Sequence, residues 1–102
     1  MENTVDLKKH EKILSFKTYF SFEDSPEEFL RENPSLAKRA IRLLDRIEKF
    51  CGVEYAFVHV QEGPFGGYCA PTPKNYKPQN PLVTKVLASY DRQYFEDFLR
   101  KQ

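Results

Sequence analysis

The sequence predicts a small α+β protein, a single domain over residues 1–102 that is built from two repeated strand–loop–helix units with two main strands. Three observations lead to this class. The chain has the length of one domain with one core. Two stretches carry the residue pattern of strands, and a helical pattern begins twice at an Asn-Pro pair, at residues 33–34 and 80–81. The repeats are expected to cover about residues 12–51 and 53–101.

The first strand is expected at residues 14–22. Bulky residues alternate there with mostly polar ones, which is typical of a strand with one buried face. The expected inward set is Leu14, Phe16, Thr18, Phe20 and Phe22. A short helix should follow, because Ser25 suits a helix N-cap and Pro26 suits the first helical position. It should end before Pro34, since a residue that precedes proline avoids the helical conformation.

A long helix is predicted from Pro34 to Phe50. Asn33 can cap it, and Gly52 can adopt the left-handed conformation that ends a helix. Its apolar residues fall within an arc of about 100°, as expected for a helix with one face in the core. They are Leu36, Ala40, Leu43, Leu44, Ile47, Phe50 and Cys51.

The second strand is expected at residues 53–60, where β-branched and aromatic residues predominate. Both of its faces are apolar, which indicates a central or well-covered strand. Residues 61–81 then form a long loop rich in glycine and proline. Part of this loop can fold back as a short hairpin arm, with the turn near Gly66 and Gly67 and with residues 68–70 paired. Loops of this length in compact domains are often functional.

The last helix is expected to begin at Asn80-Pro81 and to run to Lys101. Its apolar direction drifts by about 100° between the two halves. The first half centres on Val83, Val86, Leu87 and Tyr90, and the second on Phe95, Phe98 and Leu99. Either the helix kinks near residues 89–91, or its second half is buried on a different side. That side could belong to a second copy of the chain, so that Phe95 and Leu99 would support a homodimer.

Two repeats would leave a groove between them, lined from both halves. The supporting alignment matches Asn, Pro and Lys at one offset, residues 33–38 against 80–85. Grooves between packed elements are common binding sites, and an exposed strand edge can take up an extended peptide. The first functional hypothesis is therefore a non-enzymatic binding or adaptor protein that holds a peptide or protein segment in this groove. The expected contact residues, all aromatic and in the long loop, are Phe65, Tyr68 and Tyr76.

Five cations share one face of the helix at 34–50, within an arc of about 100° that contains no acid. They are Lys38, Arg39, Arg42, Arg46 and Lys49. Such a face suits phosphates, so the second functional hypothesis is a nucleic-acid-binding protein. The alternative is an ordinary solvated face whose charges pair with acids elsewhere, such as those at residues 23–28.

The overall composition gives little direction to function. The net charge is +1, so the whole chain has no strong preference for nucleic acid or membrane. No apolar run approaches the ~20 residues that span a bilayer. The first residues lack the apolar segment of a signal peptide. We therefore expect an intracellular protein without a membrane partner.

Catalytic and metal signatures are weak. Cys51 and Cys69 are too far apart in sequence for a metal-binding pair. Free thiols are expected in a reducing compartment, and a disulfide in the interior of a hyperthermophile. His59 and Cys69 would form a nucleophile pair only within hydrogen-bond distance and with a lowered thiol pKa. His10 and His59 have no cluster of further ligands around them in sequence. No enzyme activity, cofactor or metal is therefore expected.

The aromatic-rich, Lys- and Glu-rich composition, the length of 102 residues and the two expected units over residues 12–100 resemble small proteins of filamentous viruses that infect the hyperthermophilic archaeon Acidianus. The resemblance rests on length and organisation. It implies a viral protein in the host cytoplasm that has two similar motifs and no assigned activity. It carries no functional residues with it.

Overall fold

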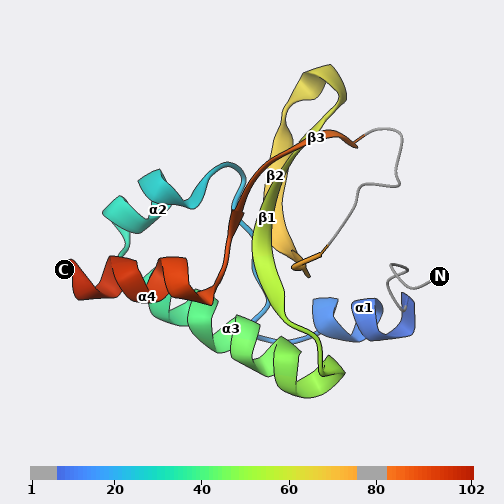
Figure 1. Cartoon of the computed structure of the whole chain (residues 1–102), viewed down its shortest axis with the longest axis horizontal. Coiled ribbons are helices and arrows are strands. Elements are labelled where there is room, and N and C mark those ends of the chain that lie inside the picture. Colours follow the sequence, from blue (N-terminus) through green and yellow to red (C-terminus); the bar gives the residue numbers. More distant parts are fainter. Residues whose placement is uncertain (1–6, 76–82) are drawn as a thin grey trace.

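The computed structural model describes residues 7–75 and 83–102, with the backbone only at residues 7, 65, 83 and 84. The chain forms a small α+β domain with a three-stranded antiparallel sheet (Figure 1). In chain order the elements are α1 (Leu7–Leu14), α2 (Pro26–Glu32), α3 (Ser35–Cys51), β1 (Tyr55–Glu62), the 3-10 turn η1 (Gly63–Phe65), β2 (Gly67–Pro73), β3 (Val83–Tyr90) and α4 (Arg92–Arg100). The predicted α+β class is confirmed.

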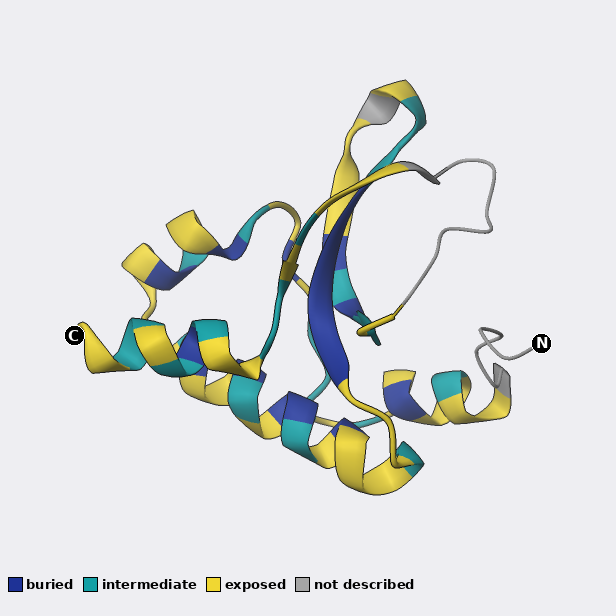
Figure 2. Ribbon diagram, in the orientation of Figure 1, coloured by how far each residue is buried: buried dark blue, intermediate teal, exposed yellow. Residues whose placement is uncertain are grey.

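The core lies between one face of the sheet and the helices, with α3 and α4 packed side by side (Figure 1). Residues 55–60 of the central strand β1 are all buried, as the dark blue ribbon in Figure 2 shows. The sheet contributes Tyr55, Phe57 and Cys69 to this core, α3 contributes Ala37, Ala40, Leu43, Leu44 and Ile47, and other segments contribute Ile13, Phe22, Leu30 and Phe95. Within the described residues, no helix is both long and apolar enough to cross a bilayer.

Helix α3 confirms the most detailed of the sequence predictions. It begins at Ser35, one residue later than expected, and ends at Cys51. Gly52 follows with φ of 70°, and its N–H donates to the carbonyl oxygen of Glu48 at 2.7 Å. Only glycine adopts this left-handed conformation at little cost, so the helix ends where the sequence indicates.

The hairpin arm and the central place of the second strand are also confirmed. The sheet order is β2-β1-β3, and His59 of β1 lies opposite Cys69 of β2. At the turn, the N–H of Glu62 donates to the carbonyl oxygen of Gly66 at 2.7 Å. A Cβ at Gly67 would lie 1.7 Å from the carbonyl oxygen of Val60, so any other residue at this position would force the backbone to shift.

The strand expected at residues 14–22 is wrong. Helix α1 ends at Leu14, residues 15–21 form turns, and only Phe22 pairs with the sheet, through two backbone hydrogen bonds of 2.8 and 2.9 Å with Cys69. Because the N–H of Cys69 points outward, the outward positions that follow along β2 are Pro71 and Pro73. Neither proline has an N–H to donate, so a longer strand cannot pair along this edge.

The helix expected from Asn80-Pro81 to Lys101 is wrong in its first half. Residues 83–90 are strand β3, paired with β1, and α4 begins only at Arg92; the expected start lies outside the described residues. The drift of the apolar direction between the two halves of this segment coincides with the change from strand β3 to helix α4. Among the described residues, three helices precede the sheet, and β1, β2, β3 and α4 follow in the second half. The repeated order of strand, loop and helix is therefore not confirmed.

Candidate functional site

The cations predicted on one face of α3 are all exposed and project from the side of the helix opposite the core. We call this set the basic face: Lys38, Arg39, Arg42, Arg46 and Lys49. Among the described residues, none of the five forms an ion pair with an acid. The alternative expectation, that acids at residues 23–28 neutralise this face, finds no support, since Asp24 lies 3.2 Å from the Nε2 atom of His59 instead.

Two phenylalanine rings hold arginines at one margin of the basic face. The guanidinium carbon of Arg46 lies 4.5 Å from the ring centroid of Phe16, and that of Arg39 lies 4.9 Å from the centroid of Phe20. Residues 15–21 therefore run alongside α3 in the opposite direction. A cation over an aromatic ring is stabilised by about 0.5–1 kcal/mol at an exposed site, so both guanidinium groups have preferred positions.

The two rings are themselves fixed by packing. Phe20 lies against Phe57 of β1, with centroids 5.3 Å apart. Phe16 meets the ring of Phe50 edge-to-face, with centroids 5.7 Å apart. Phe50 was expected in the core, but 42% of its surface is exposed, so it forms an aromatic end to the basic face beside Lys49.

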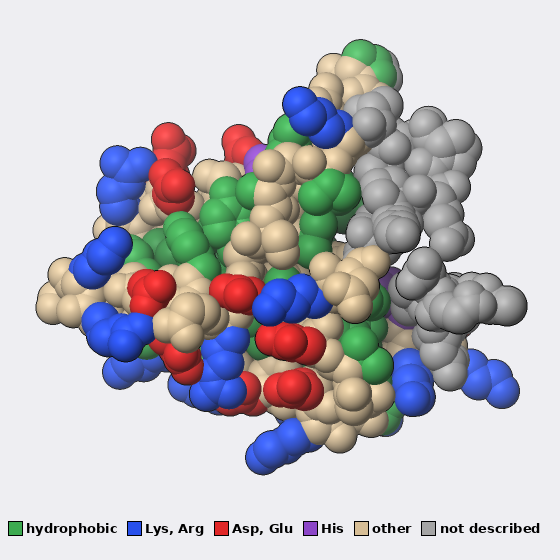
Figure 3. All heavy atoms as spheres, in the orientation of Figure 1, with side chains coloured by type: hydrophobic (Ala, Val, Ile, Leu, Met, Phe, Trp, Pro, Cys, Tyr) green, Lys and Arg blue, Asp and Glu red, His purple; other side chains and the backbone are tan. Residues whose placement is uncertain are grey.

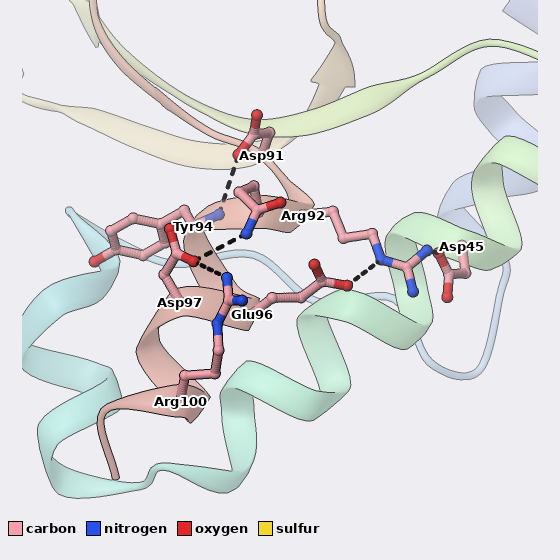
Figure 4. A network of polar contacts seen from close by, with 8 residues as sticks. Asp45, Asp91, Arg92, Tyr94, Glu96, Asp97 and Arg100 are labelled. Carbon is pink, nitrogen blue, oxygen red and sulfur yellow. Dashed lines mark hydrogen bonds and ion pairs between the residues drawn. The ribbon is translucent and has the colours of Figure 1, made fainter.

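The acids of α3 lie to one side of the basic face, the side nearer α4. Asp45 forms an ion pair with Arg92, whose Nε atom also lies 2.8 Å from Glu96 (Figure 4). On α4 itself, Gln93 and Arg100 donate to Asp97 and hold the pKa of that carboxyl group below its usual range. Acidic and basic side chains accordingly interleave on the surface over α4 (Figure 3). In the described structure, the side of α3 nearer α4 therefore forms an ion pair with α4, whereas the cations of the basic face form none.

Of the three residues expected to contact a peptide, the structure describes the side chain of Tyr68 alone. Tyr68 is 40% exposed on β2. Phe65 lies in the turn η1, where only its backbone is described, and Tyr76 lies outside the described residues. Because the repeated order of elements is not found, the groove expected between two repeats has no basis in the described structure.

The expected homodimer contact through Phe95 is wrong. Its side chain is fully buried, with its ring centroid 5.5 Å from that of Phe57 and 6.3 Å from that of Phe22. Leu99 is half-buried and packs against the same core. The second apolar direction in the sequence therefore points into this domain, because residues 83–90 belong to β3 and the helix that buries Phe95 begins only at Arg92.

The cysteines and histidines give no catalytic arrangement. Cys51 and Cys69 are both free, so the disulfide alternative is not found. Burial raises the pKa of the Cys69 thiol to about 12, and a nucleophile needs the opposite shift. His59 is its neighbour across the hairpin, but their pairing brings no exposed thiolate. In the described part of the chain, no group of three His, Cys, Asp or Glu side chains could hold a metal ion.

Comparisons with protein-family models, with curated proteins and with solved structures each returned no match. The resemblance to viral proteins therefore stays a prediction. The sequence pattern found all five cations of the basic face. It missed Phe16, Phe20 and Phe50 as parts of the same site, because the rings of residues 15–21 reach α3 only through the tertiary fold.

Proposed function

We propose that this protein binds nucleic acid through the basic face of α3. The observation that carries the proposal is the unpaired state of five exposed cations on one helix face, in a chain whose net charge is only +1. Exposed cations that have no acidic partner can replace the counterions condensed on a phosphate backbone. The release of those counterions drives binding, so affinity depends steeply on salt.

The expected salt dependence follows from the number of contacts. On a duplex, the logarithm of the binding constant falls with the logarithm of salt concentration by about 0.9 per neutralised phosphate, so five contacts give a slope of about −4.5. Raising salt from about 50 to about 200 mM should then weaken binding by about 500-fold. Fluorescence anisotropy of a labelled oligonucleotide measures both the affinity and the slope.

The decisive variant is Arg42→Glu, because Arg42 lies in the middle of the basic face. It should lower the affinity at low salt by tenfold or more and reduce the slope by about one. The matched control is Arg31→Glu on α2, an exposed arginine outside the basic face. Absence of binding at low salt, or equal effects of the two variants, would contradict the proposal.

Peptide binding stays a second candidate, supported by strand β3. Among the described residues β3 pairs only with β1, and its Val86 and Leu87 are 39% and 46% exposed. An extended peptide could add to this edge as a further strand. Peptides selected on the protein should then bind Leu87→Lys more weakly, since lysine discourages pairing at a strand edge. Selected peptides that bind the variant equally well would contradict this candidate.

A further inference from the structure

The basic face consists of two rows with different surroundings. At 100° per residue, Lys38, Arg42 and Lys49 form one row, and the row of Arg39 and Arg46 lies about 70° further round the helix. The first row has no partner in the described structure, whereas both guanidinium groups of the second lie over phenylalanine rings. The two rows therefore differ in their surroundings: two lysines and an arginine without partners in the first, and two arginines held over aromatic rings in the second.

The second row has the features of a stacking surface. Each guanidinium covers a ring on one side, and both arginines are exposed, so their outer sides face solvent. Nucleic-acid bases stack on arginine planes and on aromatic rings in proteins that bind single strands. Phe50 extends the surface with a 42% exposed ring. This end of the basic face is thus apolar as well as basic.

The spacing along the helix suits stacked bases. Arg39 and Arg46 are seven residues apart, which corresponds to about 10 Å along the axis. Successive stacked nucleotides of one strand are about 3.4 Å apart, so about three of them cover this distance. In a duplex the faces of the bases are hidden within the stack, and only the phosphates could meet α3. A single strand can meet both rows at once.

We propose that the basic face binds single-stranded nucleic acid in preference to duplex. The bases stack on the outer sides of Arg39 and Arg46 and on Phe50, and the phosphates lie along the row of Lys38, Arg42 and Lys49. This inference rests on the proposed nucleic-acid binding and names its substrate class. The recognition is tolerant of sequence, because every base has a face that can stack.

The test separates stacking from charge. Anisotropy is measured with a labelled single strand of about 12 nucleotides, as DNA and as RNA, and with the corresponding DNA duplex. Arg46→Lys keeps the charge but removes the flat group, and Phe50→Leu keeps an apolar side chain but removes the ring. Each should weaken single-strand binding by about tenfold and leave duplex binding within about twofold. The control is Arg31→Lys, which should change neither.

The outcomes distinguish this inference from the proposed function. A single-strand preference that Arg46→Lys and Phe50→Leu both reduce supports the inference. Equal affinity for both forms, with neither form affected by these two variants, overturns the inference. The proposed function still stands in that case if Arg42→Glu weakens binding by tenfold or more. Absence of binding to either form at low salt overturns both. Circular dichroism of each variant checks that the fold is unchanged.

Discussion

Replacement of Phe95 by alanine tests the position of α4 on the sheet. The side chain is fully buried, and its ring meets those of Phe57 and Phe22 at centroid distances of 5.5 and 6.3 Å. Truncation of a buried phenylalanine costs about 3–5 kcal/mol, because it removes these contacts and leaves a cavity. A domain of this size has a free energy of unfolding of about 5–15 kcal/mol, so the variant should lose a large part of its stability.

The assay is urea denaturation, followed by circular dichroism and by tyrosine fluorescence, since the chain has no tryptophan. Phe95→Leu keeps an apolar side chain in the site and should cost less than Phe95→Ala. Phe50→Ala is the control for loss of a partly exposed phenylalanine, and it should also cost less than Phe95→Ala. A cost below about 1 kcal/mol for Phe95→Ala is typical of a surface position. Together with a change of mass in light scattering, it would place the ring at a contact between copies and refute the packing described above.

Two further predictions concern the hairpin. Gly67→Ala should lower the free energy of unfolding by about 1–3 kcal/mol in the same assay, because the added Cβ meets the carbonyl oxygen of Val60; an unchanged value would show that the strand start adapts at no cost. For Cys69, burial raises the thiol pKa from 9.0 to about 12, so the folded state keeps a proton that the unfolded chain loses above pH 9. The protonated thiol therefore contributes fully to the free energy of unfolding below pH 9. This contribution falls by up to about 1.4 kcal/mol per pH unit as the pH rises toward 12. Denaturation of the wild type and of Cys69→Ala across this range should show the steeper decline in the wild type, and parallel curves would contradict the reasoning.

The sequence predicts those elements whose ends are marked by residues that start or stop a helix or allow a turn. Helix α3 is amphipathic over its whole length and is ended by Gly52, so both its bounds and its buried face could be predicted. Helix α2 likewise follows from Ser25 and Pro26, and it spans Pro26–Glu32. The hairpin follows from the glycines between two stretches that suit strands. In each case the information lies within a few residues of the feature.

Two elements were predicted wrongly, because the spacing of their apolar residues fits more than one backbone conformation. Phe16, Phe20 and Phe22 alternate as in a strand, yet all three rings turn toward the core from an irregular segment. Residues 83–90 fit one side of a helix, yet they pair with β1. An apolar pattern indicates which side chains are buried. The backbone conformation depends also on hydrogen-bonded partners elsewhere in the chain.

The sequence by itself determined α3, its five aligned cations and the α+β class, because a helix positions its side chains from local geometry alone. Only the tertiary structure decided which of those cations remain without acidic partners and which lie over aromatic rings. Arg92 comes from far along the chain to pair with Asp45, and Phe16 and Phe20 reach Arg46 and Arg39 because residues 15–21 pack along α3. Both contacts join residues distant in sequence, so no local pattern could encode them.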